Sequence, residues 1–502
     1  MIDPAAVASA WQAGDGLVAA AVLAATDPLA GSALSAVGAG RRSPRTVAVA
    51  AASVSLLASL ALTLIWSLGD GRPVARGDEM GGGALLFIDG LTAVLVPTVA
   101  LIELAILLVA PRRTLEPSAV ARILFGAGAT LALLLTSHPL ALVLLWIVTA
   151  VPTWLATRAT PGGRPAARVF AVAMVAAIVC MTVGTLLLLA DPPWEKASGP
   201  VGAAGGWLVA VAVMVRKGIV PFHSWYPALF SGASMSTALA ATMPQVAAYT
   251  AVRLLIGHAD GVASELVMLS QMALVTAAYG GALAIVQRGL RGLIGTLAMS
   301  QSAMVLAGLS GTLPMELNGA LCIWISSGLA LTGIGLVTWA LESRAGMIRL
   351  DTPQGRFWDA PALAGFFLLF GLATIGLPGT LSFVADDLIV SGSLDEQLHA
   401  GLLVIVATVL SGIAVMRGWF SVFGGPVEPD GPRHAILPRE RIALSALLFP
   451  LFALGLAPAP LVRSLERAAG QLLGKPAVTA ADPRPAAEES DILRLHESNG
   501  GR

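Results

Sequence analysis

The sequence predicts an all-α, polytopic membrane protein with about fourteen transmembrane helices. Three observations predict this fold class. Of the 502 residues, 56% are hydrophobic and 12% are charged, and the mean hydropathy is +0.81. Apolar runs long enough to cross a bilayer recur along the chain, with short connections between them. Basic residues are concentrated in alternate connections, as expected of cytoplasmic loops.

The apolar runs give the expected spans in order. They lie near 17–38, 46–68, 85–110, 120–136, 139–157, 167–190, 203–220, 236–257, 263–286, 292–310, 316–341, 360–392, 401–424 and 442–465. Asp27 and Pro28 interrupt the first run, and the twelfth contains a Pro/Gly break that disfavours a continuous helix. No basic residue occurs from Met1 to Gly16, so we expect a retained span instead of a cleaved signal peptide.

Loop charge predicts the orientation of these spans. One set of alternate loops holds seventeen Lys and Arg residues, whereas the other set holds only Arg72, Arg76 and Lys196. Because short cytoplasmic loops hold the basic excess, we expect both termini outside the cytoplasm of a bacterial plasma membrane. The lipid bilayer is then the main surrounding of the chain.

Several classes of function are disfavoured by composition. The formal net charge is zero, which predicts no nucleic-acid partner. Cys180 and Cys322 stand alone in apolar runs, which excludes a disulfide framework or an iron–sulfur cluster built from this chain. Because the sequence has no Gly-rich phosphate loop after a strand and no metal-ligand spacing, we expect no cofactor, no metal and no catalytic site of its own.

Arg216 and Lys217 are the first charged residues that point to a function. A charge at the bilayer centre costs at least about 2.5–3.5 kcal/mol, so such residues are functional candidates. The two cations end an apolar run, and the following stretch contains two prolines and no further charge until Arg253. This pattern favours a broken helix. The alternative is a helix end with two cations reaching the cytoplasmic face.

Carboxylates occur in two other runs. Asp386 and Asp387 follow a Gly/Pro break, and two adjacent carboxylates cannot both ionise cheaply at low dielectric, so the pair can hold and release a proton. An acidic turn at the outer surface is the alternative. A charged, interrupted span in each half of the chain is typical of transporters built from internal repeats. Glu103 is alone in the third run, where a functional and a neutral structural role are both open.

Neutral polar residues form a further candidate set on three of the central runs. They are Gln245, Ser300, Gln301, Ser302, Ser326 and Ser327. Groups of this kind more often join helices by hydrogen bonds than carry protons, although they can also anchor a chain of water molecules.

Three stretches resemble a known family. They are Arg216 to Pro227 (RKGIVPFHSWYP), Asp89-Gly90-Leu91, and Asn318-Gly319-Ala320. They resemble the proton-conducting antiporter-like subunits of respiratory complex I, Mrp cation/proton antiporters and membrane-bound hydrogenases, over about residues 87–423. The resemblance implies two inverted five-helix repeats, each with a broken helix, and a line of buried polar groups across the membrane plane.

The resemblance also assigns roles and boundaries. Arg216 takes the place of the broken-helix lysine, with Lys217 beside it, and Asp386 takes the place of the second repeat's Lys or Glu. His223, within the first motif, is expected to orient a group or relay a proton. The implied divisions are 1–115 (helices 1–3), 116–260 (first repeat, helices 4–8), 261–425 (second repeat, helices 9–13), 426–470 (last helix) and 471–502 (a polar, mobile tail).

Three departures from the family pattern affect the predicted path. Ile147 stands where the family has a glutamate after Trp146. Gln245 or Leu239 replaces a lysine or histidine of the eighth helix, and Ser327 replaces a histidine of the eleventh. Because a buried cation without an anion is costly, we hypothesise that Glu103 is the counter-charge of Arg216 and Lys217. Arginine does not deprotonate, so Lys217 is the expected titrating member.

The resemblance implies a proton-conducting subunit of a larger, complex I-like assembly. Protons would pass through water, Lys217, the polar residues of the central helices and Asp386. Other membrane subunits and a soluble or redox partner would complete the assembly. Three alternatives remain open at this point: Mrp-type cation/proton exchange, energy-coupled inorganic-carbon uptake, and a membrane scaffold that has lost conduction.

Overall fold

The computed structural model describes residues 4–36, 43–69, 71–77, 83–191, 199–256, 263–311, 314–426 and 435–472. Apart from one small sheet, the described chain is helical, which confirms the predicted all-α membrane fold. Of the predicted polar tail, only the first two residues belong to a described helix, and 473–502 lie outside the described residues.

The first third of the chain forms long helices. They are α1 (Pro4–Ala36), α2 (Pro44–Leu68), α3 (Gly90–Val109), α4 (Pro117–Leu134), α5 (Pro139–Ala159) and α6 (Arg164–Ala190). Proline occupies the first turn of α2, α4, α5 and α6, where its fixed φ and missing N–H suit a helix start. Between α2 and α3, strands β1 (Val74–Arg76) and β2 (Leu86–Ile88) pair antiparallel, with Val74 opposite Ile88.

Two interrupted helices follow. The first consists of α7 (Pro200–Lys217) and α8 (Trp225–Gly232), and the second of α9 (Met235–Thr242) and α10 (Val246–Leu254). The remaining helices are α11 (Ala263–Ile285), α12 (Leu290–Leu309), α13 (Pro314–Ala345), α14 (Pro361–Thr374), α15 (Leu381–Glu396), α16 (Leu398–Phe423), α17 (Pro438–Leu456) and α18 (Ala459–Leu472). Each half of the chain therefore contains a helix broken beside charged residues, as predicted.

Within the described ranges, eleven helices are long and apolar enough to cross a membrane, or twelve if the bent pair α17 and α18 forms one span. The expected number of fourteen is therefore not confirmed. The fourteenth predicted span, 442–465, is this bent pair, and the rest of the difference lies in the eighth and twelfth predicted spans, 236–257 and 360–392. Each of these is divided into two helices too short to cross a bilayer alone.

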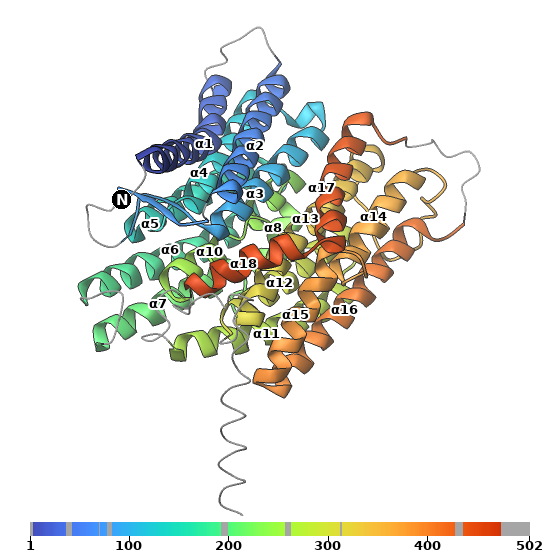
Figure 1. Ribbon diagram of the computed structural model, residues 1–502. Helices are drawn as coiled ribbons and strands as arrows, with labels where there is room; N and C mark the ends of the chain where they lie inside the picture. Colours follow the sequence, from blue (N-terminus) through green and yellow to red (C-terminus); the bar gives the residue numbers. More distant parts are fainter. Residues whose placement is uncertain are drawn as a thin grey trace, which may run out of the picture.

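The core is formed around α12 and α13, whose apolar stretches are buried along their whole length. Figure 1 shows the helices of the first half, in blue to green, on one side of this pair and the orange helices on the other. Helix α18 is bent by 82° from α17 and crosses the bundle, where it contacts α13 and α3. Polar residues on α12 and α13 are thus remote from lipid.

Two glycines set the distance between α6 and α7. A Cβ on Gly184 would lie 2.9 Å from the carbonyl oxygen of Gly205, and a Cβ on Gly205 would lie 2.8 Å from that of Gly184. Small residues allow such close approach of helix backbones in a membrane. The contact holds α7, and hence the cations at its end, against the bundle.

We expect Gly184→Leu to lower the free energy of unfolding by about 1–3 kcal/mol, because the added side chain overpacks the α6–α7 contact. Thermal unfolding of the protein in nanodiscs measures this effect. Val183→Leu is the matched control, since Val183 is 43% exposed on the same helix. Equal unfolding midpoints for the two variants would contradict the proposed role of the glycine contact.

Candidate functional site

The break after α7 is built from local capping interactions. Gly218 has φ 69°, and the N–H groups of Gly218 and Ile219 donate to the carbonyls of Val215 and Met214. This is the Schellman arrangement, which ends a helix at a residue with left-handed backbone. Trp225 Nε1 donates to Val215 O at 2.8 Å, and Val220 N donates to Thr276 Oγ1 at 3.0 Å. The opened backbone therefore finds partners within the protein, as it must where water is scarce.

Lys217 is the last residue of α7 and is only 2% exposed. Its Nζ donates to Gln245 Oε1 at 2.6 Å. No described carboxylate lies within ion-pair distance of this ammonium. Of the two positions considered from sequence, Gln245 and Leu239, it is therefore Gln245 that contacts the buried cation.

Gln245 lies at the second break, between α9 and α10, and has an unusual backbone. Its φ of 52° makes it the one described residue other than glycine with a positive φ. Such a conformation costs of order 1–3 kcal/mol and is found where the surrounding structure requires it. The preceding residue, Pro244, accepts a hydrogen bond on its carbonyl from Trp324 Nε1 of α13 at 3.3 Å. The break thus aims the Gln245 side chain at the end of α7.

Arg216 points away from Lys217, toward α5. Its Nη1 donates to Trp146 O and its Nη2 to Thr149 Oγ1, both at 2.6 Å, and its Cζ lies 4.4 Å from the centre of the Trp146 ring. The two adjacent cations therefore have separate surroundings. The guanidinium is bound by neutral groups of α5. These groups flank Ile147, the position where the resemblance implies a glutamate.

A cavity adjoins Arg216 between α4, α5, α9 and α10. Its lining residues are Arg122, Ile123, Gly126, Thr130, Thr149, Pro152, Thr153, Ala156, Arg216, Thr237, Ala240, Ala241 and Val246. The lining includes two guanidinium groups and four threonine hydroxyls but no carboxylate. The cavity is therefore positively charged, with apolar side chains and threonines in the rest of its wall.

The polar residues of the central helices are buried as predicted. Gln301 on α12 is 5% exposed and Ser327 on α13 is 3% exposed. Ser300 Oγ donates to Ala277 O at 2.7 Å and joins α12 to α11, a structural contact. The Ser327 hydroxyl is buried without a hydrogen-bond partner among the described residues. Ser327 is thus free to bind water, whereas Ser300 is already engaged.

The two aspartates of α15 differ in their surroundings. Asp386 is partly buried and folds back against the break before α15, whereas Asp387 is exposed on the surface of the chain. Gly376 in this break has φ 79°, and a Cβ at this residue would lie 2.6 Å from Asp386 Oδ2. Only a glycine leaves room for this carboxylate, so the break and the side chain fit one another.

Glu103 does not meet Arg216 or Lys217 in the structure. It is 3% exposed on α3 and lines a small cavity with residues of α1, α2 and α4. Its Oε2 has no hydrogen-bond partner and it forms no ion pair with any described residue. The cavity beside Arg216 is a different one, because it is lined by other residues of α4. The hypothesis that Glu103 is the direct counter-charge of Arg216 and Lys217 is therefore not supported.

His223 lies within the first break, between α7 and α8. Its ring packs edge-on against Tyr279 of α11, with 5.2 Å between ring centres. Its Nδ1 is buried and has no hydrogen-bond partner in the described part of the chain. The position is compatible with the predicted relay role, which stays a prediction.

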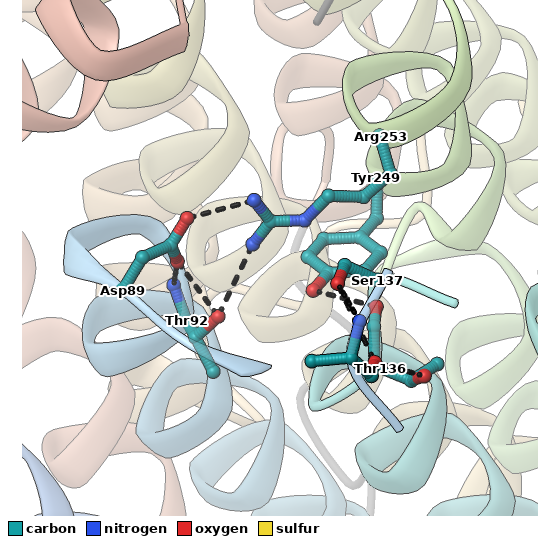
Figure 2. A network of polar contacts seen from close by, with 7 residues as sticks. Asp89, Thr92, Thr136, Ser137, Tyr249 and Arg253 are labelled. Carbon is teal, nitrogen blue, oxygen red and sulfur yellow. Dashed lines mark hydrogen bonds and ion pairs between the residues drawn. The ribbon is translucent and has the colours of Figure 1, made fainter. Parts of the chain in front are cut away.

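An ion pair that the sequence did not single out joins α3 to α10. Arg253 Nη1 lies 2.7 Å from Asp89 Oδ2, and both side chains are 6% exposed. Figure 2 shows the guanidinium directed at Asp89 and Thr92, with Tyr249 beside it. Asp89 also caps α3 by accepting from Thr92 N at 2.9 Å. A signal was present, since Arg253 is a cation within an apolar run and four residues after Tyr249.

The broken helices, the buried cation beside them and the central polar helices are features of a multi-pass membrane protein with a candidate ion path. Residues 168–411 match the family model described as NADH:quinone oxidoreductase/Mrp antiporter, transmembrane part. This match confirms the predicted resemblance. It runs from α6 into α16 and includes three helix breaks.

Curated relatives are NADH-quinone oxidoreductase subunits. Subunit M of Mycobacterium tuberculosis is 26% identical over 56% of this chain and 52% of its own length. Subunit N 2 of Solidesulfovibrio magneticus is 29% identical over 57% of this chain and 61% of its own length. The chain thus matches little more than half the length of these relatives.

Solved structures share the fold over most of the chain. A chain of respiratory complex I from Thermus thermophilus superposes with a TM-score of 0.80 and 21% identity, covering 90% of this chain and all of the other. A chain of the Mrp complex from Dietzia sp. gives a TM-score of 0.81 at 19% identity, covering 90% and 97%. At this identity the likeness concerns the fold alone.

We expect Arg253→Met to lower the free energy of unfolding by about 3–5 kcal/mol, because it leaves the Asp89 carboxylate buried without its cation. Adding Asp89→Asn should recover much of the loss, since the charge is removed and the cap is kept. Denaturant unfolding in nanodiscs measures both. Asp351→Ala, in the exposed pair with Arg349, should cost about 1 kcal/mol or less. A single Arg253 variant as stable as this control would disprove the structural role.

Proposed function

We propose that the chain is a proton-conducting membrane subunit of a complex I-like or related multi-subunit complex. The observation that carries the proposal is Lys217, a buried lysine held by a neutral side chain where two broken helices meet. A buried ionisable residue within a membrane marks an ion path by default. Unwound helix ends beside it are the usual surroundings of such a path.

The Lys217–Gln245 contact suits a group that gains and loses a proton. A charged ammonium donates to the amide oxygen, whereas a neutral amine can accept from the amide N–H₂ after rotation of the same side chain. A carboxylate partner would hold the charged form by an ion pair. The neutral partner therefore satisfies Lys217 in both states and imposes a smaller penalty on proton release.

The remaining candidates lie on helices that form a continuous series of contacts starting at α7. Helix α7 contacts α10, α10 contacts α12, α12 contacts α13, and α13 contacts α15. In this order the helices bear Lys217, Gln245, Gln301, Ser327 and Asp386. Protons would move along this line through bound water, with polar side chains as anchors. Asp386 would end the line at the break before α15, and Glu103 would lie outside it.

The surrounding assembly is part of the proposal. Repeats at 116–260 and 261–425 would each supply one charged break to the path, and 1–115 and 426–470 would flank them. We infer a bacterial plasma membrane with both termini outside the cytoplasm, because basic residues are concentrated in one set of loops. Other membrane subunits, and a soluble or redox partner, would drive transport.

Three alternatives remain, of which two keep transport and one loses it. Mrp-type cation/proton exchange and inorganic-carbon uptake would use the same residues but a different partner, and the Mrp fold fits as well as that of complex I. A scaffold without conduction is favoured by one observation, the neutral binding of Arg216 in place of a carboxylate. Flux measurements separate the scaffold from the rest.

We expect Lys217→Ala to reduce proton flux into liposomes containing the purified complex by roughly 100-fold, the low end of what a positioned proton-transfer group contributes. Lys217→Arg should be nearly as inactive, because arginine keeps the charge but does not release the proton. Arg349→Gln, an exposed cation outside the path, is the control. Wild-type flux in both Lys217 variants would favour the scaffold.

Asp386 and Asp387 form a natural matched pair for the second break. Asp386→Asn should reduce flux strongly, because the carboxamide cannot take up a proton, whereas Asp387→Asn should change it less than twofold, since that side chain is exposed outside the path. The same liposome assay compares them. If Asp386→Asn conducted protons as fast as Asp387→Asn, Asp386 would not be part of the proton path.

A further inference from the structure

The cavity beside Arg216 holds positive charge without a visible counter-charge. Arg216 is bound there only by a backbone carbonyl, a hydroxyl and an aromatic ring. The second guanidinium, that of Arg122, has a buried Nε without a hydrogen-bond partner, and neither arginine forms an ion pair with a described residue. Two guanidinium groups thus share one cavity with no anion from the described chain.

Such an arrangement is costly unless an anion enters. Arginine stays charged at any physiological pH, so Arg216 cannot relieve the cost by losing its proton. Removing an anion from a buried cation is strongly destabilising, and neutral dipoles compensate only part of the charge. The position where the family resemblance expects a carboxylate is Ile147, which supplies none.

We propose that this cavity binds a small monovalent anion, which takes the place of the missing carboxylate. Arg122 and Arg216 would supply charge-assisted hydrogen bonds, and the hydroxyls of Thr130, Thr153 and Thr237 would donate to the same ligand. The chemistry fits a halide or a small oxyanion such as bicarbonate. Arg122 lies in the second turn of α4, next to a basic loop, and would attract the anion to the cavity.

The anion would also set the electrostatic surroundings of Lys217. Arg216 is adjacent in sequence, and an anion that neutralises it would lower the repulsion felt by a proton arriving at Lys217. The effect of the anion on Lys217 rests on the proposed proton conduction, whereas anion binding in the cavity does not. The two can therefore fail separately, because binding is measured without any proton flux.

The test is thermal unfolding of the full-length chain in nanodiscs, in sodium gluconate against sodium chloride and sodium bicarbonate at equal ionic strength and pH. A ligand that binds only the folded state raises the midpoint, and we expect a rise of about 2 °C or more with the small anion that binds. Comparison of the chloride and bicarbonate series identifies which of the two it is.

Three variants locate the site. Thr149→Glu, which places a carboxylate beside Arg216, and Arg122→Gln should both lose the anion-dependent rise, whereas Arg158→Gln on the exposed end of α5 should keep it. A rise retained in Thr149→Glu and Arg122→Gln would place the anion elsewhere and overturn the proposal. A wild-type midpoint that is the same in all three salts would overturn it as well.

Discussion

The absence of water in the hydrocarbon layer is the constraint on which this structure depends. Each backbone N–H and C=O group at that depth must find a partner within the protein or in a cavity. The break after α7 meets this requirement by a Schellman ending, by Trp225 and by Thr276. Only because the open backbone is satisfied in this way can an ionisable side chain lie beside it.

The same constraint explains why neighbouring cations behave differently. Arg216 and Lys217 are consecutive, so a helical backbone directs them about 100° apart. Arg216 meets α5 and the positively charged cavity, and Lys217 meets the break between α9 and α10. A permanently charged residue and a titratable residue can thus lie at one depth without sharing a partner. The fixed charge shapes the field, and the titratable one can respond to it.

Sequence reasoning predicted the membrane fold, the two charged breaks and the burial of Lys217, Gln301 and Ser327, because hydropathy, prolines and isolated charges report directly on the cost of burial. It missed what depends on three-dimensional pairing. The Asp89–Arg253 pair spans 164 positions, and no local pattern encodes it. Glu103 was expected to be the counter-charge of Arg216 and Lys217 because a buried cation without an anion is costly, but it lines a separate cavity. The break at Gln245 was also missed, since only the tertiary structure shows its φ of 52°.

The position of helix α18 restricts how the two halves of the bundle can move relative to one another. It turns by 82° from α17 and lies across α13 and α3, so the end of the described chain is fastened to its first third. Rocking of one half of the bundle against the other would require this strap to detach. Movement of side chains and water along the central helices requires no such detachment. For the proposed conduction, the architecture therefore favours a bundle whose outer helices keep their positions.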